Sequence, residues 1–168
     1  MRRSLSVMAL LSLFLFAVAG LTACGSRSAQ AGPQNTPSVQ NTQGDPMNYH
    51  DLVAKLKDSG AKVIPGAAIS QPFMDVQGRT LAVQGEQLQV YEYASVADAN
   101  KQAVRISPDG TAFTTVSSSG VPVGATQVDW VRPPHLYKAG RVIVIYIGTN
   151  NAVMHLLEGI LGKQFAGM

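Results

Sequence analysis

The feature that most constrains this chain is an uncharged apolar run close to its N-terminus. From Leu5 to Ala23 there are 19 residues, of which 15 are apolar and none is charged. A run of this length is long enough to cross a bilayer as a helix. It also follows Arg2 and Arg3 and ends in small residues, which is the layout of a secretory signal peptide. On either interpretation, the globular domain has to form from the residues that come after it.

The residues that end the run favour the signal-peptide interpretation. The run ends in Leu21-Thr22-Ala23-Cys24, and Gly25 follows. This stretch resembles the lipobox of bacterial lipoproteins. The resemblance implies that diacylglycerol is attached to the Cys24 thiol, that the signal peptide 1–23 is cut off just before it, and that the new amino group can take a further chain such as palmitate. The alternative is an uncleaved membrane helix with an incidental cysteine.

The chemistry of the lipobox agrees with these residue types. A thiolate is the nucleophile that lipid transfer requires, and small side chains before it give a peptidase access to the backbone. Cys24 is the only cysteine, which excludes an intrachain disulfide and any multi-cysteine metal site. Each buried methylene contributes ~0.8 kcal/mol to membrane binding, so two or three acyl chains anchor a protein durably. The resemblance therefore implies a bilayer as the first partner of this chain.

The location of the anchored domain follows from the same resemblance. A lipoprotein of this kind sits in the cell membrane or the outer membrane, with its domain facing the periplasm or the cell exterior. In a bacterium with two membranes, Gly25 in place of an aspartate resembles an outer-membrane address.

Residues 24–46 are predicted to be the lipidated cysteine and a flexible tether. After Cys24 the segment is rich in Gly, Ser, Gln, Asn, Thr and Pro, and Val39 is its only branched apolar residue. Such a composition cannot bury enough surface to offset its ordering entropy. A flexible chain of 22 residues spans roughly 25 Å. The alternative is that this segment itself binds a partner such as the cell wall.

The positive charge of the chain does not indicate a nucleic-acid partner. The formal net charge is +3 and the pI is about 9.2. Residues 47–168, however, carry 10 Lys and Arg against 9 Asp and Glu. A nearly neutral domain lacks the basic surface that phosphate backbones require. We therefore expect no nucleic acid among its partners.

Residues 47–168 are predicted to fold as a single α+β domain. Capping residues at Asn48, Ser95 and Thr149 or Asn150 each precede apolar side chains at helical spacing, which predicts three helices. Extended segments are predicted in four places: 61–74 with a Pro65-Gly66 turn, the hairpin 79–90, 111–116, and 127–131. The β-branched run 141–147 is predicted to be a central strand. The order of these elements has no regular strand–helix alternation, so we expect an antiparallel sheet with helices on one face, in two layers.

The sequence favours a non-enzymatic protein without a cofactor or metal. The three histidines are His50, His135 and His155, and no HExxH, GxSxG or GxxxxGK[ST] pattern is present. The serine-rich stretch 117–124 is interpreted as a mobile loop, and Asp109 as a turn residue. A hydrolase that assembles a histidine and carboxylates from distant segments remains an alternative.

Two groups of residues are candidate binding surfaces. Tyr91 and Tyr93 share the strand face opposite Leu88 and Val90, where an aromatic pair could cover a ligand. The alternative is that helices pack on that face or that a bulge turns the rings inward.

The second candidate surface is the segment 132–140, interpreted as a loop between two strands. Its two prolines stiffen it, and its donors and aromatic surface come from Arg132, His135, Tyr137 and Lys138. The alternative is a plain hairpin connection.

Two longer stretches, VYEYASVADANKQAVRISPDGTAF and VDWVRPPHLYKAGRVIVIYIGTN, look like those of small bacterial lipoproteins for which no activity is established. The sequence thus predicts an anchored envelope lipoprotein whose domain binds an envelope protein or a small ligand. The other two hypotheses are a small envelope hydrolase and an inhibitor or accessory subunit that acts through the 132–140 loop.

Overall fold

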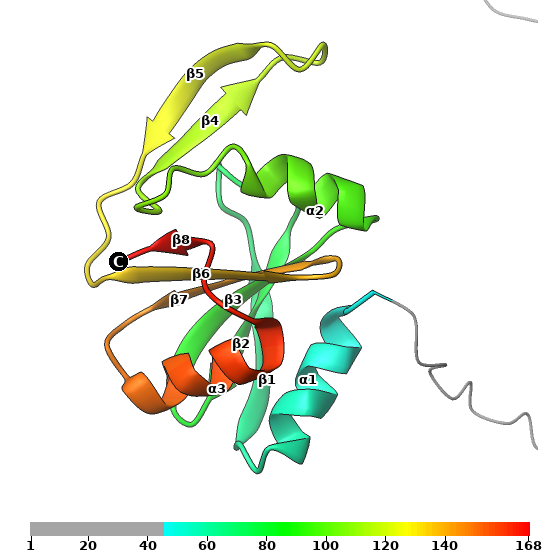
Figure 1. The fold of residues 1–168 in the computed structure, drawn as a ribbon, viewed down its shortest axis with the longest axis vertical. Coiled ribbons are helices and arrows are strands. Elements are labelled where there is room, and N and C mark those ends of the chain that lie inside the picture. The colour runs from blue at the N-terminus through cyan, green and yellow to red at the C-terminus, as the bar shows by residue number, and fades with distance from the viewer. Residues whose placement is uncertain (1–45) are drawn as a thin grey trace, which may run out of the picture. The chain divides into compact units, whose positions relative to one another are not determined.

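A computed structural model describes residues 46–168 of the chain. The predicted signal peptide 1–23, Cys24 and nearly all of the predicted tether lie outside the described residues, so lipidation stays a prediction. The described part has three helices, a six-stranded antiparallel sheet and a separate two-stranded sheet (Figure 1). The α+β class predicted from the sequence is therefore confirmed.

The three helices begin at the predicted capping residues. They are α1 (Tyr49–Asp58), α2 (Val96–Ala103) and α3 (Asn151–Leu161). At α1, the Asn48 side chain accepts from the Asp51 N–H at 3.0 Å, and the Asp51 carboxylate accepts from the Asn48 N–H at 3.3 Å. The Ser95 side chain accepts from the Asp98 N–H at the start of α2, and the Asn150 side chain accepts from the Ala152 and Val153 N–H groups at the start of α3. These bonds satisfy backbone donors that a helix cannot satisfy itself, which explains why local sequence fixes the start of each helix.

The large sheet places the predicted β-branched strand near its centre. The strand order is β1-β2-β3-β7-β6-β8, and every neighbouring pair is antiparallel. The predicted hairpin is confirmed as β2 (Gly78–Val83) and β3 (Glu86–Glu92). It turns at Gln84 and Gly85, whose φ angles of 52° and 87° match the left-handed backbone of a tight hairpin turn. The other strands are β1 (Val63–Ile69), β6 (Pro134–Ala139), β7 (Val142–Ile147) and β8 (Ala166–Gly167).

The first strand differs from its prediction. Pro65-Gly66 does not form a turn; β1 runs through both residues, and its register against β2 shifts between Pro65 and Ala68. Because β1 is an edge strand, the missing N–H of a proline costs no ladder bond, and a bulge absorbs the irregularity.

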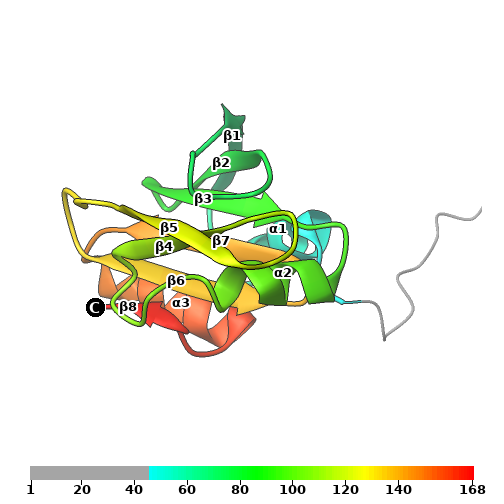
Figure 2. The same ribbon diagram turned by 90° about the horizontal axis from the view of Figure 1, so that it is seen from above.

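Both faces of the large sheet are covered, whereas the sequence predicted two layers with helices on one face. Helices α1 and α3 pack on one face, and α2 lies on the other together with the base of the two-stranded sheet (Figures 1 and 2). The reason lies in β7, which is apolar at every position. Val142, Val144 and Tyr146 join the core under α1 and α3, while Ile143 and Ile145 join the core under α2. An uninterrupted apolar strand requires cover on both faces.

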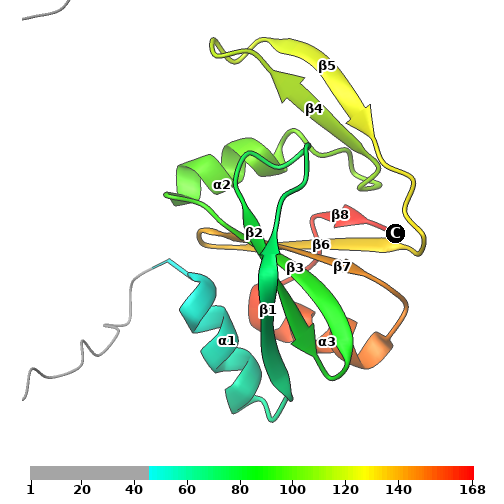
Figure 3. The same ribbon diagram turned by 180° about the vertical axis from the view of Figure 1, so that it is seen from behind.

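The two-stranded sheet is a hairpin that stands away from the large sheet (Figure 3). It consists of β4 (Ala112–Val116) and β5 (Pro122–Gln127). The stretch 117–124, predicted to be a mobile loop, instead forms the turn and the first half of β5. The predicted strand 127–131 is also wrong, since β5 ends at Gln127. Val128 and Trp130 nevertheless pack on the same core, as their alternation indicated.

Candidate binding site

The segment 132–140 is not a loop, which corrects the second candidate surface. Residues Pro134–Ala139 form β6, which pairs with β7 on one side and with β8 on the other. Pro134 is the first residue of the strand, a position where a proline costs no ladder bond. The hypothesis of an inhibitor or accessory subunit acting through a 132–140 loop therefore loses its structural basis.

Strand alternation separates the four candidate residues of this segment. His135 and Tyr137 are buried and point toward α3, and Leu136 between them points toward the other core. Lys138 is half-buried, and Arg132 is exposed just before the strand. Successive side chains of a strand face opposite sides of a sheet, so His135 and Tyr137 share one side and Lys138 faces the other.

Tyr91 and Tyr93 share one face of the sheet, as predicted from the sequence, but this face is buried and not open to solvent. Both rings lie opposite Leu88 and Val90 as predicted, in the core under α2, with exposed fractions of 0% and 3%. The Tyr91 hydroxyl donates to Gln89 Oε1 at 2.7 Å. The Tyr93 hydroxyl is buried and has no hydrogen-bond partner among the described residues. The alternative, in which a helix packs on this face, is the one that the structure adopts.

Burial of the tyrosines predicts loss of stability at alkaline pH. Desolvation raises the pKa of Tyr91, Tyr93, Tyr137 and Tyr146 above the ordinary value of about 10. Above that pH the unfolded chain releases phenol protons that the folded chain retains, so stability is full below it and falls as pH rises further. We expect the urea midpoint to drop above pH about 10, with tyrosinate absorbance at 295 nm rising together with loss of the circular dichroism signal. Four of five tyrosines ionising near pH 10 in a chain that stays folded would contradict this.

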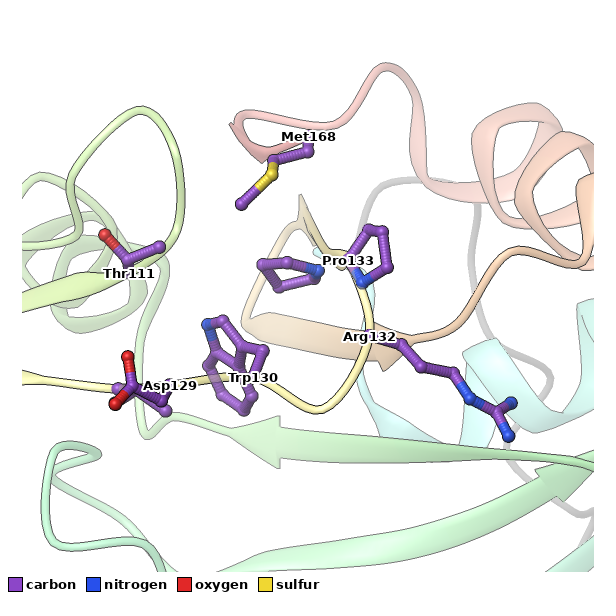
Figure 4. Close-up of a pocket in the computed structure, with 8 residues that line it drawn as sticks. Thr111, Asp129, Trp130, Arg132, Pro133 and Met168 are labelled. Carbon is purple, nitrogen blue, oxygen red and sulfur yellow. The ribbon is translucent and has the colours of Figure 1, made fainter.

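A hollow with mostly apolar lining lies beside Trp130, the only tryptophan of the chain (Figure 4). Its volume is about 390 Å³. It lies where the base of the hairpin, the connection to β6 and the C-terminus meet. The lining residues are Thr111, Val128, Asp129, Trp130, Arg132, Pro133, Pro134 and Met168. This volume falls within the range of ligand sites in proteins, about 300–1,000 Å³.

The Trp130 side chain is fixed in the wall of this hollow. Its indole Nε1 donates to the Gly110 carbonyl at 2.8 Å. Its ring meets Phe73 and Phe113 edge-on, with centroid distances of 5.9 and 6.3 Å. Met168 and Pro133 lie across from the indole, and the Arg132 guanidinium points away from them (Figure 4). The hollow thus offers a rigid aromatic wall and apolar sides, with the charges of Asp129 and Arg132 at its edge.

A second hollow, of about 480 Å³, lies on the other side of β6. Its lining is more polar and comes from β6, α3 and the C-terminal segment. The residues are His135, Tyr137, Asn151, Met154, His155, Glu158, Lys163, Gln164 and Met168. Burial, and next the Glu158 charge, raise the pKa of the Tyr137 hydroxyl above its ordinary value.

His135 is held by both of its ring nitrogens. Its Nδ1 lies 2.9 Å from Gln164 Oε1, and its Nε2 lies 3.1 Å from the Gly148 carbonyl oxygen. Because a backbone carbonyl only accepts, Nε2 carries a proton and donates to it. The ring also stacks on Tyr146, with centroids 5.9 Å apart. Neither nitrogen faces a carboxylate, so His135 fastens β6 to its neighbours and is not poised as a general base.

Sequence reasoning named Arg132 in the first hollow and His135 and Tyr137 in the second, but it did not single out Trp130, His155, Glu158 or Gln164. The sequence pattern placed Trp130 on a strand. Two features of the sequence could have singled it out: it is the only tryptophan, and it lies two residues before Arg132. His155 and Glu158 are three residues apart and share one side of α3, a spacing visible in the sequence. Gln164 comes from the C-terminal segment and reaches His135 only through the fold.

Within residues 46–168, no group of three or more His, Cys, Asp or Glu side chains lies close enough to hold a metal ion. None of the helices in this part of the chain has the length and apolarity to span a bilayer. Comparison of the chain with protein-family models, with curated proteins and with solved structures gave no match.

Proposed function

We propose that this chain is an envelope lipoprotein, anchored through acylated Cys24, whose domain binds an envelope protein or a small ligand without catalysing a reaction. The lipobox-like Leu21-Thr22-Ala23-Cys24 and the polar segment behind it support the anchor. In this proposal, the anchor lies in the cell membrane or the outer membrane, and the domain faces the periplasm or the cell exterior.

The Trp130 hollow is the observation that supports binding most directly. An aromatic wall that is already fixed by a hydrogen bond and two ring contacts loses little freedom when a partner arrives. Tryptophan is enriched among residues that dominate binding energy, and here Trp130 forms one wall of the hollow. Its apolar sides suit an apolar side chain or a small ligand of similar size.

Photo-crosslinking in the native envelope tests this proposal. A photoreactive residue at Asp129, which is exposed and lines the hollow, is expected to give one discrete adduct. The matched control is Lys57, which is exposed at the end of α1. If the partner is a small ligand, the emission of Trp130 should shift when low-mass envelope components are added. The same products from both positions, together with unchanged emission, would argue against a binding site in the hollow.

The hydrolase hypothesis keeps one specific observation in its favour. His155 and Glu158 line the second hollow together with Tyr137. Because both nitrogens of His135 are engaged, His155 is the histidine left to act as a base there. Hydrolysis of an ester, peptide or glycan by the purified chain, abolished by His155→Ala and retained in Asp129→Asn, would favour this alternative over binding.

A further inference from the structure

The second hollow, between β6, α3 and the C-terminal segment, contains polar groups that the described part of the chain leaves without partners. Its volume of about 480 Å³ lies within the range of small-ligand sites in proteins. Most buried polar groups of proteins are hydrogen-bonded, so a group without a partner in a hollow requires an explanation. Three lining residues have this property: Tyr137, Glu158 and Lys163.

The Tyr137 hydroxyl is the unpartnered group at the floor of the hollow. Tyr137 is only 3% exposed and comes from β6. Its hydroxyl makes no hydrogen bond with any residue in 46–168. Within the same residues, the only side-chain polar atom that is both enclosed by protein and unpartnered is the Tyr93 hydroxyl. The Tyr137 hydroxyl is therefore not enclosed, and the hollow is the open space that it reaches.

Two charges of opposite sign lie at the rim of the hollow. Glu158 belongs to the second half of α3, Lys163 follows the end of that helix, and both residues are exposed. Neither takes part in an ion pair within residues 46–168. They do not pair with each other, so their charged atoms lie farther apart than the roughly 4 Å of an ion pair. Both charges are thus open to a bound molecule.

The negative charge lies nearer the floor than the positive one. The charge of Glu158 contributes to the raised pKa of the Tyr137 hydroxyl, and that of Lys163 does not. The Glu158 carboxylate and the Tyr137 hydroxyl are not hydrogen-bonded to each other, which leaves a gap between them. Both oxygens accept hydrogen bonds, so an ammonium group in this gap donates to both. The ammonium group of Lys163 only donates, so it suits a carboxylate.

We propose that this hollow binds a short peptide of about two residues whose ends are both free. The ammonium end of the peptide lies between Glu158 and the Tyr137 hydroxyl, and its carboxylate end accepts from Lys163. A side chain of the peptide packs against Met154 and Met168, and the peptide is released unchanged. This site rests neither on the lipid anchor nor on the Trp130 hollow, so its failure would leave the proposed function untouched.

Charge and spacing favour a dipeptide as the ligand. A rim with one unpaired acid and one unpaired base is complementary to a molecule that carries both charges, whereas a singly charged molecule meets one attractive and one repulsive group. In a free amino acid, both charges are attached to one Cα. A dipeptide adds one residue, roughly 3.5 Å, between them. The wider spacing suits rim charges that lie too far apart to pair with each other.

Calorimetric titration of the purified full chain with matched forms of one peptide tests the charge assignment. The probe is leucyl-alanine with both ends free. Its matched forms are the C-terminal amide, the N-acetyl peptide and the peptide blocked at both ends. Because each blocked end removes a charge-assisted hydrogen bond, we expect each to weaken binding at least about tenfold. Free leucine should also bind at least about tenfold more weakly than the dipeptide.

Substitutions in the chain assign the two ends of the peptide. Glu158→Gln should weaken binding of the free peptide about tenfold and leave that of the N-acetyl form unchanged. Lys163→Gln should weaken binding of the free peptide to a similar degree and leave that of the amide unchanged. Because both residues are exposed, neither substitution threatens the fold. Tyr137→Phe, which keeps the ring, should act like Glu158→Gln.

The matched control is Lys57→Gln, which removes an exposed charge at the end of α1 and should keep the unaltered affinity. Equal affinity for the four peptide forms, or equal losses from Lys57→Gln and Glu158→Gln, would overturn the proposal. No binding of the free dipeptide at millimolar concentration, or tighter binding of leucine than of the dipeptide, would also overturn it. Cleavage of the peptide during the titration would overturn it in favour of the hydrolase alternative.

Discussion

Replacing Cys24 with alanine is expected to abolish incorporation of labelled fatty acid and to release the chain from its lipid anchor. In the proposed lipoprotein the Cys24 thiol accepts diacylglycerol, and the sequence contains no other cysteine that could substitute. Since each buried methylene contributes ~0.8 kcal/mol, losing two or three acyl chains removes essentially all of the anchor's membrane affinity. The measurements are metabolic labelling with palmitate and fractionation of the envelope.

The control for this experiment is Ser26→Ala, which changes a small residue just after the lipobox and leaves the thiol in place. It should label and fractionate like the unaltered chain. Equal labelling of the Cys24→Ala chain would refute the anchor. A chain that is unlabelled in both forms but remains in the membrane would instead support the uncleaved-helix alternative.

Truncating a buried apolar side chain on either face of the large sheet is expected to destabilise the domain strongly, and to a similar degree on both faces. Leu88 lies in the core under α1 and α3, Ile145 lies in the core under α2, and both are fully buried. Leu88→Ala and Ile145→Ala should each lower the free energy of unfolding by about 2–5 kcal/mol, because each removes apolar contacts and leaves a cavity. Urea unfolding followed by circular dichroism measures both values.

Ile64→Ala is the matched control for these two variants. Ile64 is also a strand residue, but it lies on β1 with 52% of its surface exposed. Its truncation should change stability by less than about 0.5 kcal/mol. A large effect of Leu88→Ala with a negligible effect of Ile145→Ala would restore the two-layer arrangement that the sequence predicted.

The parts of the fold that were predicted correctly depend on neighbouring residues. Helix α1 begins where Asn48 and Asp51 exchange hydrogen bonds three positions apart, and β2 and β3 meet at a turn whose residues are adjacent in the chain. The apolar run of β7 indicated a central strand because a strand of that composition has to be covered. Each of these signals acts over a few residues, so the sequence alone was sufficient to reveal them.

The errors arose where a distant segment decides the structure. Residues 134–139 read as part of a proline-stiffened loop, yet they form β6, which makes a tight hairpin with β7 and is paired on its other edge by the distant C-terminal β8. His135 lines the second hollow, but Gln164, which comes from the distant C-terminal segment, and the Gly148 carbonyl lie against its ring nitrogens. The short C-terminal strand that covers the second edge of β6 has only two residues, too few to show a strand pattern in the sequence.

The sequence by itself determined the α+β class, the starts of the three helices, and the prediction of a lipid anchor at Cys24. These depend on capping, periodicity and a short motif, all of which are local. The tertiary structure alone decided that the large sheet is covered on both faces, that Tyr91 and Tyr93 lie inside, and that Trp130 forms one wall of a hollow. Burial and hollows depend on which distant surfaces meet, and that is settled only when the whole chain packs.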